Sequence, residues 1–217
     1  MRPSTSLVLG TGALVLLTAT ACAGAGTATE SPTSSLTAGS LADGDRYQSQ
    51  RFVTPLEVAV PAWLPAVPDT DEPNFLTWIG TDASFDRAVR FLVPVNVYQP
   101  GSAAATPPPD DYLSYLRGQV TYGAQLADET RTSVGGMPTT IVTGTTGAPL
   151  DGSLGCPAAD VPAPDCFGLQ PGMALRLAVI DVVDTTVLAW ARVTEGSADT
   201  AEAFADFEQM LGSLRFR

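Results

Sequence analysis

Alternation of apolar and other side chains marks the first folded segments of the chain. Residues 56–60 alternate in this way, which is the period of a strand with one buried face. Residues 75–79 form a second short apolar segment, and residues 88–98 form a third that contains Pro94. Because proline cannot donate a hydrogen bond to a neighbouring strand, Pro94 predicts a sheet edge or a bulge.

Two later segments have helical spacing instead. Apolar residues recur at intervals of three and four over residues 113–120, just after the run Thr-Pro-Pro-Pro-Asp-Asp. Proline and aspartate suit the first turn of a helix, so this run predicts a helix start. Residues 203–214 carry a second apolar stripe. It follows Asp199 and Glu202, whose spacing is typical of a capping box.

Four further strands are predicted between these two helices. Residues 129–134 and 139–143 flank a Gly-Gly-Met-Pro turn, and residues 175–183 and 187–193 are the clearest strand patterns in the chain. Between the two pairs, residues 144–173 are rich in Gly and Pro, and we expect a long loop there. The order of elements predicts an α+β fold, with an antiparallel sheet flanked by two helices.

The first residues have the pattern of an export signal. Arg2 precedes an apolar run over residues 7–17, and small residues then lead to Cys22, which is the layout of a secretory signal. A cysteine at the cut resembles the bacterial lipobox, in which that cysteine becomes the lipidated first residue. Ala19 departs from the pattern, since leucine is usual there. A cleaved signal without lipid, an uncleaved membrane helix and a cytosolic protein with an apolar start stay as alternatives.

A linker separates this signal from the folded domain. Residues 23–50 consist mainly of Ala, Gly, Ser and Thr, which cannot bury enough apolar surface to offset the entropy lost on ordering. We therefore expect a lipoprotein signal peptide over residues 1–22, a flexible tether over residues 23–50 and a single domain over residues 51–217. This arrangement predicts a domain held at the outer face of the cell membrane by lipid on Cys22.

Charge and composition exclude several classes of function. The 217 residues include 11 basic and 23 acidic ones, for a formal net charge of −12, and they contain neither His nor Lys. Such an acidic surface repels nucleic acid. Without His there is no imidazole base for a serine triad, and without Lys there is no P-loop or Schiff-base lysine. We therefore expect no catalytic residues, no metal site and no cofactor.

Two cysteines remain once Cys22 is assigned to the lipid anchor. Cys156 and Cys166 lie ten positions apart, and in an exported protein they are expected to form a disulfide. The bridge would stiffen the loop at 144–173, which either recognises a partner or only covers an edge of the sheet. The candidate recognition residues in this loop are Asp151, Asp160, Asp165 and Phe167.

Several weaker motifs are better explained by ordinary structure. Residues 151–155 read Asp-Gly-Ser-Leu-Gly, close to the nucleophile elbow of hydrolases, but the chain has no His to act as base. Residues 184–186 read Asp-Thr-Thr and lack the Gly and the second copy of an aspartic-protease motif. The acids of the loop do not have EF-hand spacing. The tyrosines of the first helix either line a groove or, more simply, cover the sheet.

Three segments together resemble one known family. Residues 58–63 form an opening strand that runs into a Pro-Ala-Trp turn, residues 134–138 form a Gly-Gly hairpin, and residues 210–216 end a closing helix on Ser-Leu-Arg-Phe. This pattern is similar to the PsbP-like α/β/α sandwich domains, a family that includes lipoproteins of Gram-positive bacteria. The resemblance implies an antiparallel sheet flanked by helices and an accessory or interaction role. It implies no catalysis and carries over no site residue.

We therefore expect a lipid-anchored, non-enzymatic domain that binds an unknown envelope protein or a small ligand. Two alternatives remain, an extracytoplasmic hydrolase that uses carboxylates and serine, and a purely structural envelope lipoprotein. A cleft that holds two acids about 5–10 Å apart would favour the hydrolase. A surface with neither a pocket nor an apolar patch would favour the structural role.

Overall fold

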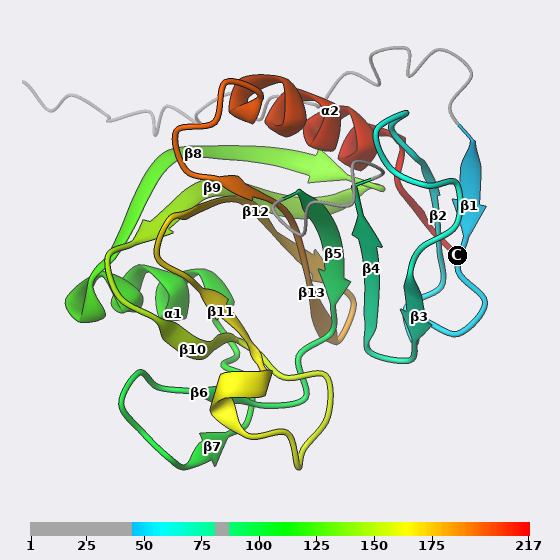
Figure 1. The fold of residues 1–217 in the computed structure, drawn as a ribbon. Helices are drawn as coiled ribbons and strands as arrows, with labels where there is room; N and C mark the ends of the chain where they lie inside the picture. Colours follow the sequence, from blue (N-terminus) through cyan, green and yellow to red (C-terminus); the bar gives the residue numbers. More distant parts are fainter. Residues whose placement is uncertain (1–44, 81–86) are drawn as a thin grey trace, which may run out of the picture. The chain divides into compact units, whose positions relative to one another are not determined.

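A seven-stranded antiparallel sheet is the main element of the structure, a computed structural model that describes residues 45–80 and 87–217 (Figure 1). The two clearest strand patterns in the sequence lie at the centre of this sheet and pair over their full length. Its strands are, in spatial order, β3 (Thr70–Glu72), β4 (Phe75–Ile79), β5 (Ala88–Leu92), β13 (Thr185–Thr194), β12 (Met173–Val182), β9 (Met137–Thr146) and β8 (Ala124–Val134).

Smaller elements surround this sheet. A three-stranded sheet has β2 (Leu56–Ala59) between β1 (Arg46–Gln48) and β14 (Arg215–Phe216). Two further pairs are β6 (Val97–Tyr98) with β7 (Ala105–Thr106), and β10 (Leu150–Gly155) with β11 (Phe167–Leu169). The helices are α1 (Tyr112–Gly118), the 3-10 turns η1 (Gln119–Tyr122) and η2 (Ala163–Asp165), and α2 (Thr200–Ser213).

Helix α2 covers one face of the large sheet (Figure 1). Its apolar stripe buries Phe207, Met210 and Leu211 in one cluster with Trp78 and Phe91 of the sheet. Each such side chain contributes roughly 1.5–3 kcal/mol when it is fully buried. The stripe read from the sequence is therefore the contact that fixes α2 on the sheet.

Helix α1 and the pair β10–β11 cover the opposite face. Tyr112 and Leu116 of α1 are buried in one cluster with Leu154 of β10 and Trp190 of β13. The Tyr112 hydroxyl donates a hydrogen bond to the Leu154 carbonyl at 3.1 Å. The first tyrosine of α1 thus covers the sheet, and it also lines a small hollow beside the end of β12.

The predicted α+β class, an antiparallel sheet flanked by two helices, is confirmed. The predicted signal, the lipidation site at Cys22 and residues 23–44 of the predicted tether lie outside the described residues. Within the described ranges, no helix is both long enough and apolar enough to cross a membrane. Lipid anchoring therefore stays a prediction from the sequence.

The folded domain begins earlier than residue 51. Strand β1 lies inside the segment predicted as tether, and it pairs with β2 from Arg46↔Ala59 to Gln48↔Glu57. The ring of Tyr47 also packs on that of Trp78, with centroids 5.5 Å apart. The composition of residues 23–50 alone does not indicate these contacts. Because of them, the end of that segment belongs to the domain.

The segment at 144–173 also differs from the predicted loop. It contains β10, η2 and β11, and the predicted disulfide joins Cys156 to Cys166 with their Cα atoms 4.6 Å apart. Glycine allows β10 and β11 to approach closely, since a Cβ on Gly168 would lie 2.1 Å from the carbonyl oxygen of Leu150. Gly168 therefore marks a close approach of two paired strands and not an unstructured loop.

Candidate functional site

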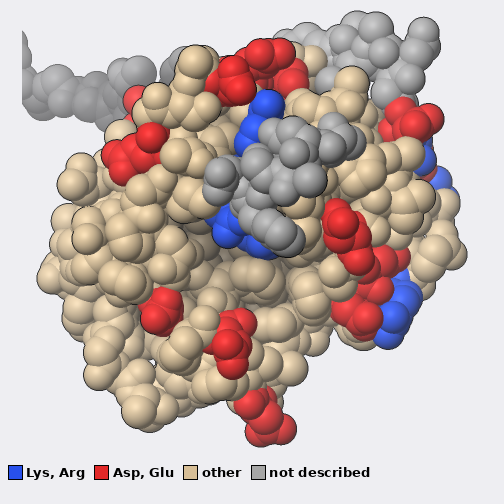
Figure 2. Space-filling view, in the orientation of Figure 1, with Lys and Arg blue, Asp and Glu red and all other residues tan. Residues whose placement is uncertain are grey.

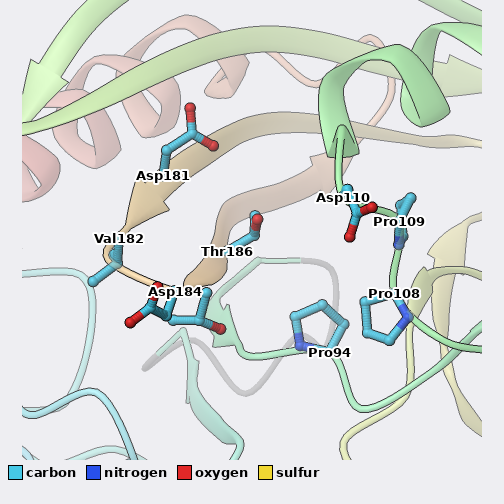
Figure 3. Close-up of a pocket in the computed structure, with 9 residues that line it drawn as sticks. Pro94, Pro108, Pro109, Asp110, Asp181, Val182, Asp184 and Thr186 are labelled. Carbon is cyan, nitrogen blue, oxygen red and sulfur yellow. The ribbon is translucent and has the colours of Figure 1, made fainter.

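Two hollows at one end of β12 and β13 form an acidic groove. The larger hollow has a volume of about 510 Å³, and the smaller one has a volume of about 290 Å³ and shares Asp110 and Asp181 with it. In Figure 3, Asp110 and the prolines before α1 face the β12–β13 turn across the larger hollow. That hollow is lined by Pro94, Pro108, Pro109, Asp110, Asp181, Val182, Asp184, Thr185 and Thr186.

The β12–β13 hairpin positions one wall of the acidic groove. Asp181 pairs with Thr186, and Val182 pairs with Thr185, so the turn consists of only two residues. Asp184 in that turn has φ of 61°, a left-handed conformation that aspartate adopts more readily than most residues. A short turn on two long paired strands gives this wall a rigid support.

The segment before α1 positions the other wall. Asp111 caps the helix, and its carboxylate accepts hydrogen bonds from the Ser114 backbone N–H at 2.9 Å and the Ser114 hydroxyl at 2.6 Å. Asp110 therefore stays outside the helix, after two prolines whose φ angles are fixed by their rings. The run predicted to start a helix thus also supplies an acid to the acidic groove.

The carboxylates of the acidic groove have no basic counterpart in the described part of the chain. Asp110, Asp181 and Asp184 are exposed, and none of the ion pairs among the described residues includes them. Acidic side chains are also more widespread than basic ones on the face shown in Figure 2. The described residues hold no group of three acids or other ligands arranged for a metal ion. The acidic groove therefore presents negative charge that no described basic side chain neutralises.

The residues predicted for the recognition loop do not converge on one site. Asp151 accepts a hydrogen bond from the Gln170 side chain at 2.7 Å, whereas Asp160 is exposed on a turn. Phe167 is half-buried and packs on Trp190, with ring centroids 5.3 Å apart. Asp165 and Phe167 line a third, smaller hollow without the other two. Asp151 and Asp160 therefore lie apart from this hollow, whereas Asp165 and Phe167 lie at its wall.

The weak motifs are explained by ordinary structure, as we expected. Ser153, the serine of the near-elbow motif, lies in β10 with 0% of its surface exposed, so no substrate reaches its hydroxyl. Asp184 of the Asp-Thr-Thr motif lies in the hairpin turn. Asp199 stands at the N-cap of α2 as expected, but its side chain makes no capping hydrogen bond. Its carboxylate lies 3.7 Å from the Arg87 guanidinium instead.

The comparisons with known proteins show similarity of fold alone. The chain matches no protein-family model and no curated protein sequence. Among solved structures, it is similar to cyanobacterial PsbP (CyanoP) from Synechocystis sp. PCC 6803, with 11% identity and a TM-score of 0.44 over 82% of this chain and 96% of that one. It is also similar to the Ran-binding protein Mog1p of Saccharomyces cerevisiae, with 8% identity and a TM-score of 0.41 over 74% and 89%.

At such identities, no residue of the acidic groove can be matched to a residue of these neighbours. That the chain is a lipoprotein of a Gram-positive bacterium stays a prediction.

Proposed function

We propose that this chain is a lipid-anchored cell-envelope protein whose folded domain binds a positively charged segment of a partner protein in the acidic groove. The domain binds without catalysis. The observation that carries this proposal is a hollow of about 510 Å³ that is lined by three exposed aspartates without basic partners among the described residues.

The chemistry of the rim favours a peptide segment over a small cation. Three prolines line the larger hollow, and Val183 at the tip of the turn is 77% exposed. An extended segment that carries both Arg or Lys and apolar side chains would contact the carboxylates and this apolar rim at once. Complementary charge of this kind mainly increases specificity and the rate of association.

The test is a titration of the full-length chain with a short peptide of alternating Arg and Val, followed by fluorescence polarisation. The groove variant Asp110→Asn, Asp181→Asn, Asp184→Asn should bind about tenfold more weakly or worse, because all three charges of the groove are removed. Binding to the wild type should weaken in high salt, which screens exposed charges.

A matched variant distinguishes binding in the acidic groove from general attraction to the negative charge of the protein. Glu195→Gln, Glu202→Gln, Asp206→Asn removes three acids in and before α2, which covers the other face of the sheet. This variant should bind the peptide like the wild type. Equal weakening of the two triple variants would show attraction to overall charge only, and the groove would then not be the binding site.

The hydrolase alternative also finds its acids in this groove, because Asp110 and Asp181 line both hollows. A carboxyl group that acts as a general acid needs an apolar, buried setting, whereas Asp110, Asp181 and Asp184 are all exposed. If the wild type hydrolysed a glycoside or peptide substrate and the groove variant did not, the function would be catalysis and not binding.

A further inference from the structure

A second site lies towards the other end of β13 from the acidic groove. A hollow of about 170 Å³, here called the arginine pocket, is formed where β5 and β13 meet the end of the disulfide-bridged segment. Its chemistry differs from that of the acidic groove, because two guanidinium groups and two aromatic rings line it. The side chains that matter for its chemistry are those of Arg90, Asp165, Phe167, Gln170, Trp190 and Arg192.

The sheet register brings the two arginines together. Arg90 of β5 pairs with Trp190, and Arg192 of β13 pairs with Ala88. The two arginines are therefore diagonal neighbours on the face of the sheet that Trp190 occupies. The guanidinium carbon of Arg90 lies 5.5 Å from the centre of the Phe167 ring, so one cation is held against an aromatic face.

Arg176 is a buried arginine whose guanidinium has both an ion pair and hydrogen bonds within the fold. Its Nε lies 2.7 Å from the Glu208 carboxylate, and its Nη1 donates to the Asp128 carbonyl at 3.0 Å and to the Thr143 hydroxyl at 3.1 Å. The sheet and α2 are joined through this charge. Buried charges are normally paired in this manner, because an isolated one is costly.

Arg90 lacks such a partner within the described ranges. It is half-buried, and no ion pair or hydrogen bond of its side chain is found there, although Asp165 also lines the pocket. Burial and then the charge of Arg192 lower the pKa of Arg90 to about 10, so the group still carries its charge at neutral pH. A cation is thus kept partly desolvated beside a second cation.

We propose that the arginine pocket binds an oxyanion, a carboxylate or a phosphate, that is attached to a flat apolar group. The oxyanion accepts hydrogen bonds from Arg90, whose planar guanidinium fits two oxygens at once, and Arg192 adds positive charge beside it. The flat group lies against Phe167, whose ring packs on the buried Trp190. The size of the hollow suits one small ring and limits the ligand to a small molecule or one terminal group of a larger one.

The arginine pocket is a site separate from the acidic groove, since the two share no lining residue. They are opposite in charge and lie on the same face of the large sheet. The domain therefore offers one site for a cationic segment and another for a small anion.

Benzoate, phenyl phosphate, inorganic phosphate and neutral benzamide are the probes for this site. Each is titrated into the full-length chain, and binding is followed by calorimetry and by tryptophan fluorescence, to which Trp190 in the pocket contributes. Benzoate or phenyl phosphate should bind and benzamide should not. Binding of phenyl phosphate alone would indicate a phosphate ligand, and binding of benzoate alone would indicate a carboxylate.

Two single variants locate the site. Arg90→Gln should weaken binding of the aromatic oxyanion about tenfold or more, and Arg131→Gln, which removes an exposed charge from β8, should leave it unchanged. The groove variant should also bind the oxyanion like the wild type, so this inference and the proposed function can fail separately. Equal affinity for benzoate and benzamide in the wild type, or unchanged affinity in folded Arg90→Gln, would overturn the proposal.

Discussion

At the scale of single residues, Asp71 fixes the start of the folded domain. Its carboxylate accepts hydrogen bonds from the Tyr47 hydroxyl at 2.6 Å, the Ser49 hydroxyl at 2.8 Å and the Gln50 backbone N–H at 3.0 Å. Burial by itself raises the pKa of Asp71, but the hydrogen bonds together hold that pKa below its ordinary value. Burial and then Asp71 raise the pKa of Tyr47. The ionised carboxylate is therefore the form that the fold stabilises.

This carboxylate makes stability depend on pH in the acid range. Asp71→Asn should lower the free energy of unfolding by about 1–2 kcal/mol at neutral pH, because charged acceptors make stronger hydrogen bonds than neutral ones. The pKa of Asp71 is lower in the folded chain than in the unfolded chain. Its contribution to the free energy of unfolding is therefore complete above the unfolded pKa of about 4, and it is lost as the pH falls through the folded pKa. Urea unfolding at neutral and acid pH measures it.

The difference between the wild type and Asp71→Asn should therefore shrink in acid. Asp160→Asn, which changes an exposed aspartate of the same chain, should be close to neutral at both pH values. A constant difference across the acid range would mean that Asp71 acts by packing and not by its charge.

Some site residues were visible in the sequence as exceptions to a pattern. Arg90 and Arg192 interrupt apolar strands, and alternation alone places Arg192 on the same face as Trp190. A charge at a core-facing position of a strand was therefore a usable signal. The acidic groove gave no such signal, because Asp110 and Asp181 are far apart in the chain and only the packing of α1 beside the end of β12 brings them to one hollow.

At the scale of elements, the sequence predicts those that carry a strong period. Strands β12 and β13 and helix α2 lie where alternation or helical spacing placed them. Strands β1, β10 and β11 were missed, because their residues are polar or glycine-rich and carry no alternation of their own. Such strands form only when a partner strand is in place, which is information that a local pattern does not contain.

The β10–β11 hairpin depends on close approach of its two backbones. Gly168→Ala should lower the free energy of unfolding by about 2–4 kcal/mol, because the new Cβ would lie 2.1 Å from the Leu150 carbonyl oxygen and the strands must separate. Gly147→Ala is the matched control, since no atom lies within 4 Å of its Cβ. Denaturant unfolding compares the two, and similar stabilities would mean that the hairpin adjusts without cost.

At the scale of the whole molecule, the membrane anchor is the prediction that decides where the domain acts. Cys22→Ala removes the only sulfur to which the predicted lipid can be attached. The wild type should fractionate with membranes and carry the mass of a lipid, whereas the variant should appear in the soluble exported pool or remain unprocessed. Fractionation with intact-mass measurement checks this. A variant that stays membrane-bound at unchanged mass would replace the lipid anchor with a transmembrane segment.

The position of β2 between β1 and β14 determines when folding can be completed. Strand β14 ends at Phe216 and pairs with β2, and Arg217 reaches Glu57 across 160 positions of sequence. Until the ribosome has released these residues, β2 has one open edge, and the closure over so long a segment slows folding. This delay would suit the export that the sequence predicts, because β1 and β2 cannot complete their sheet before β14 has been synthesised.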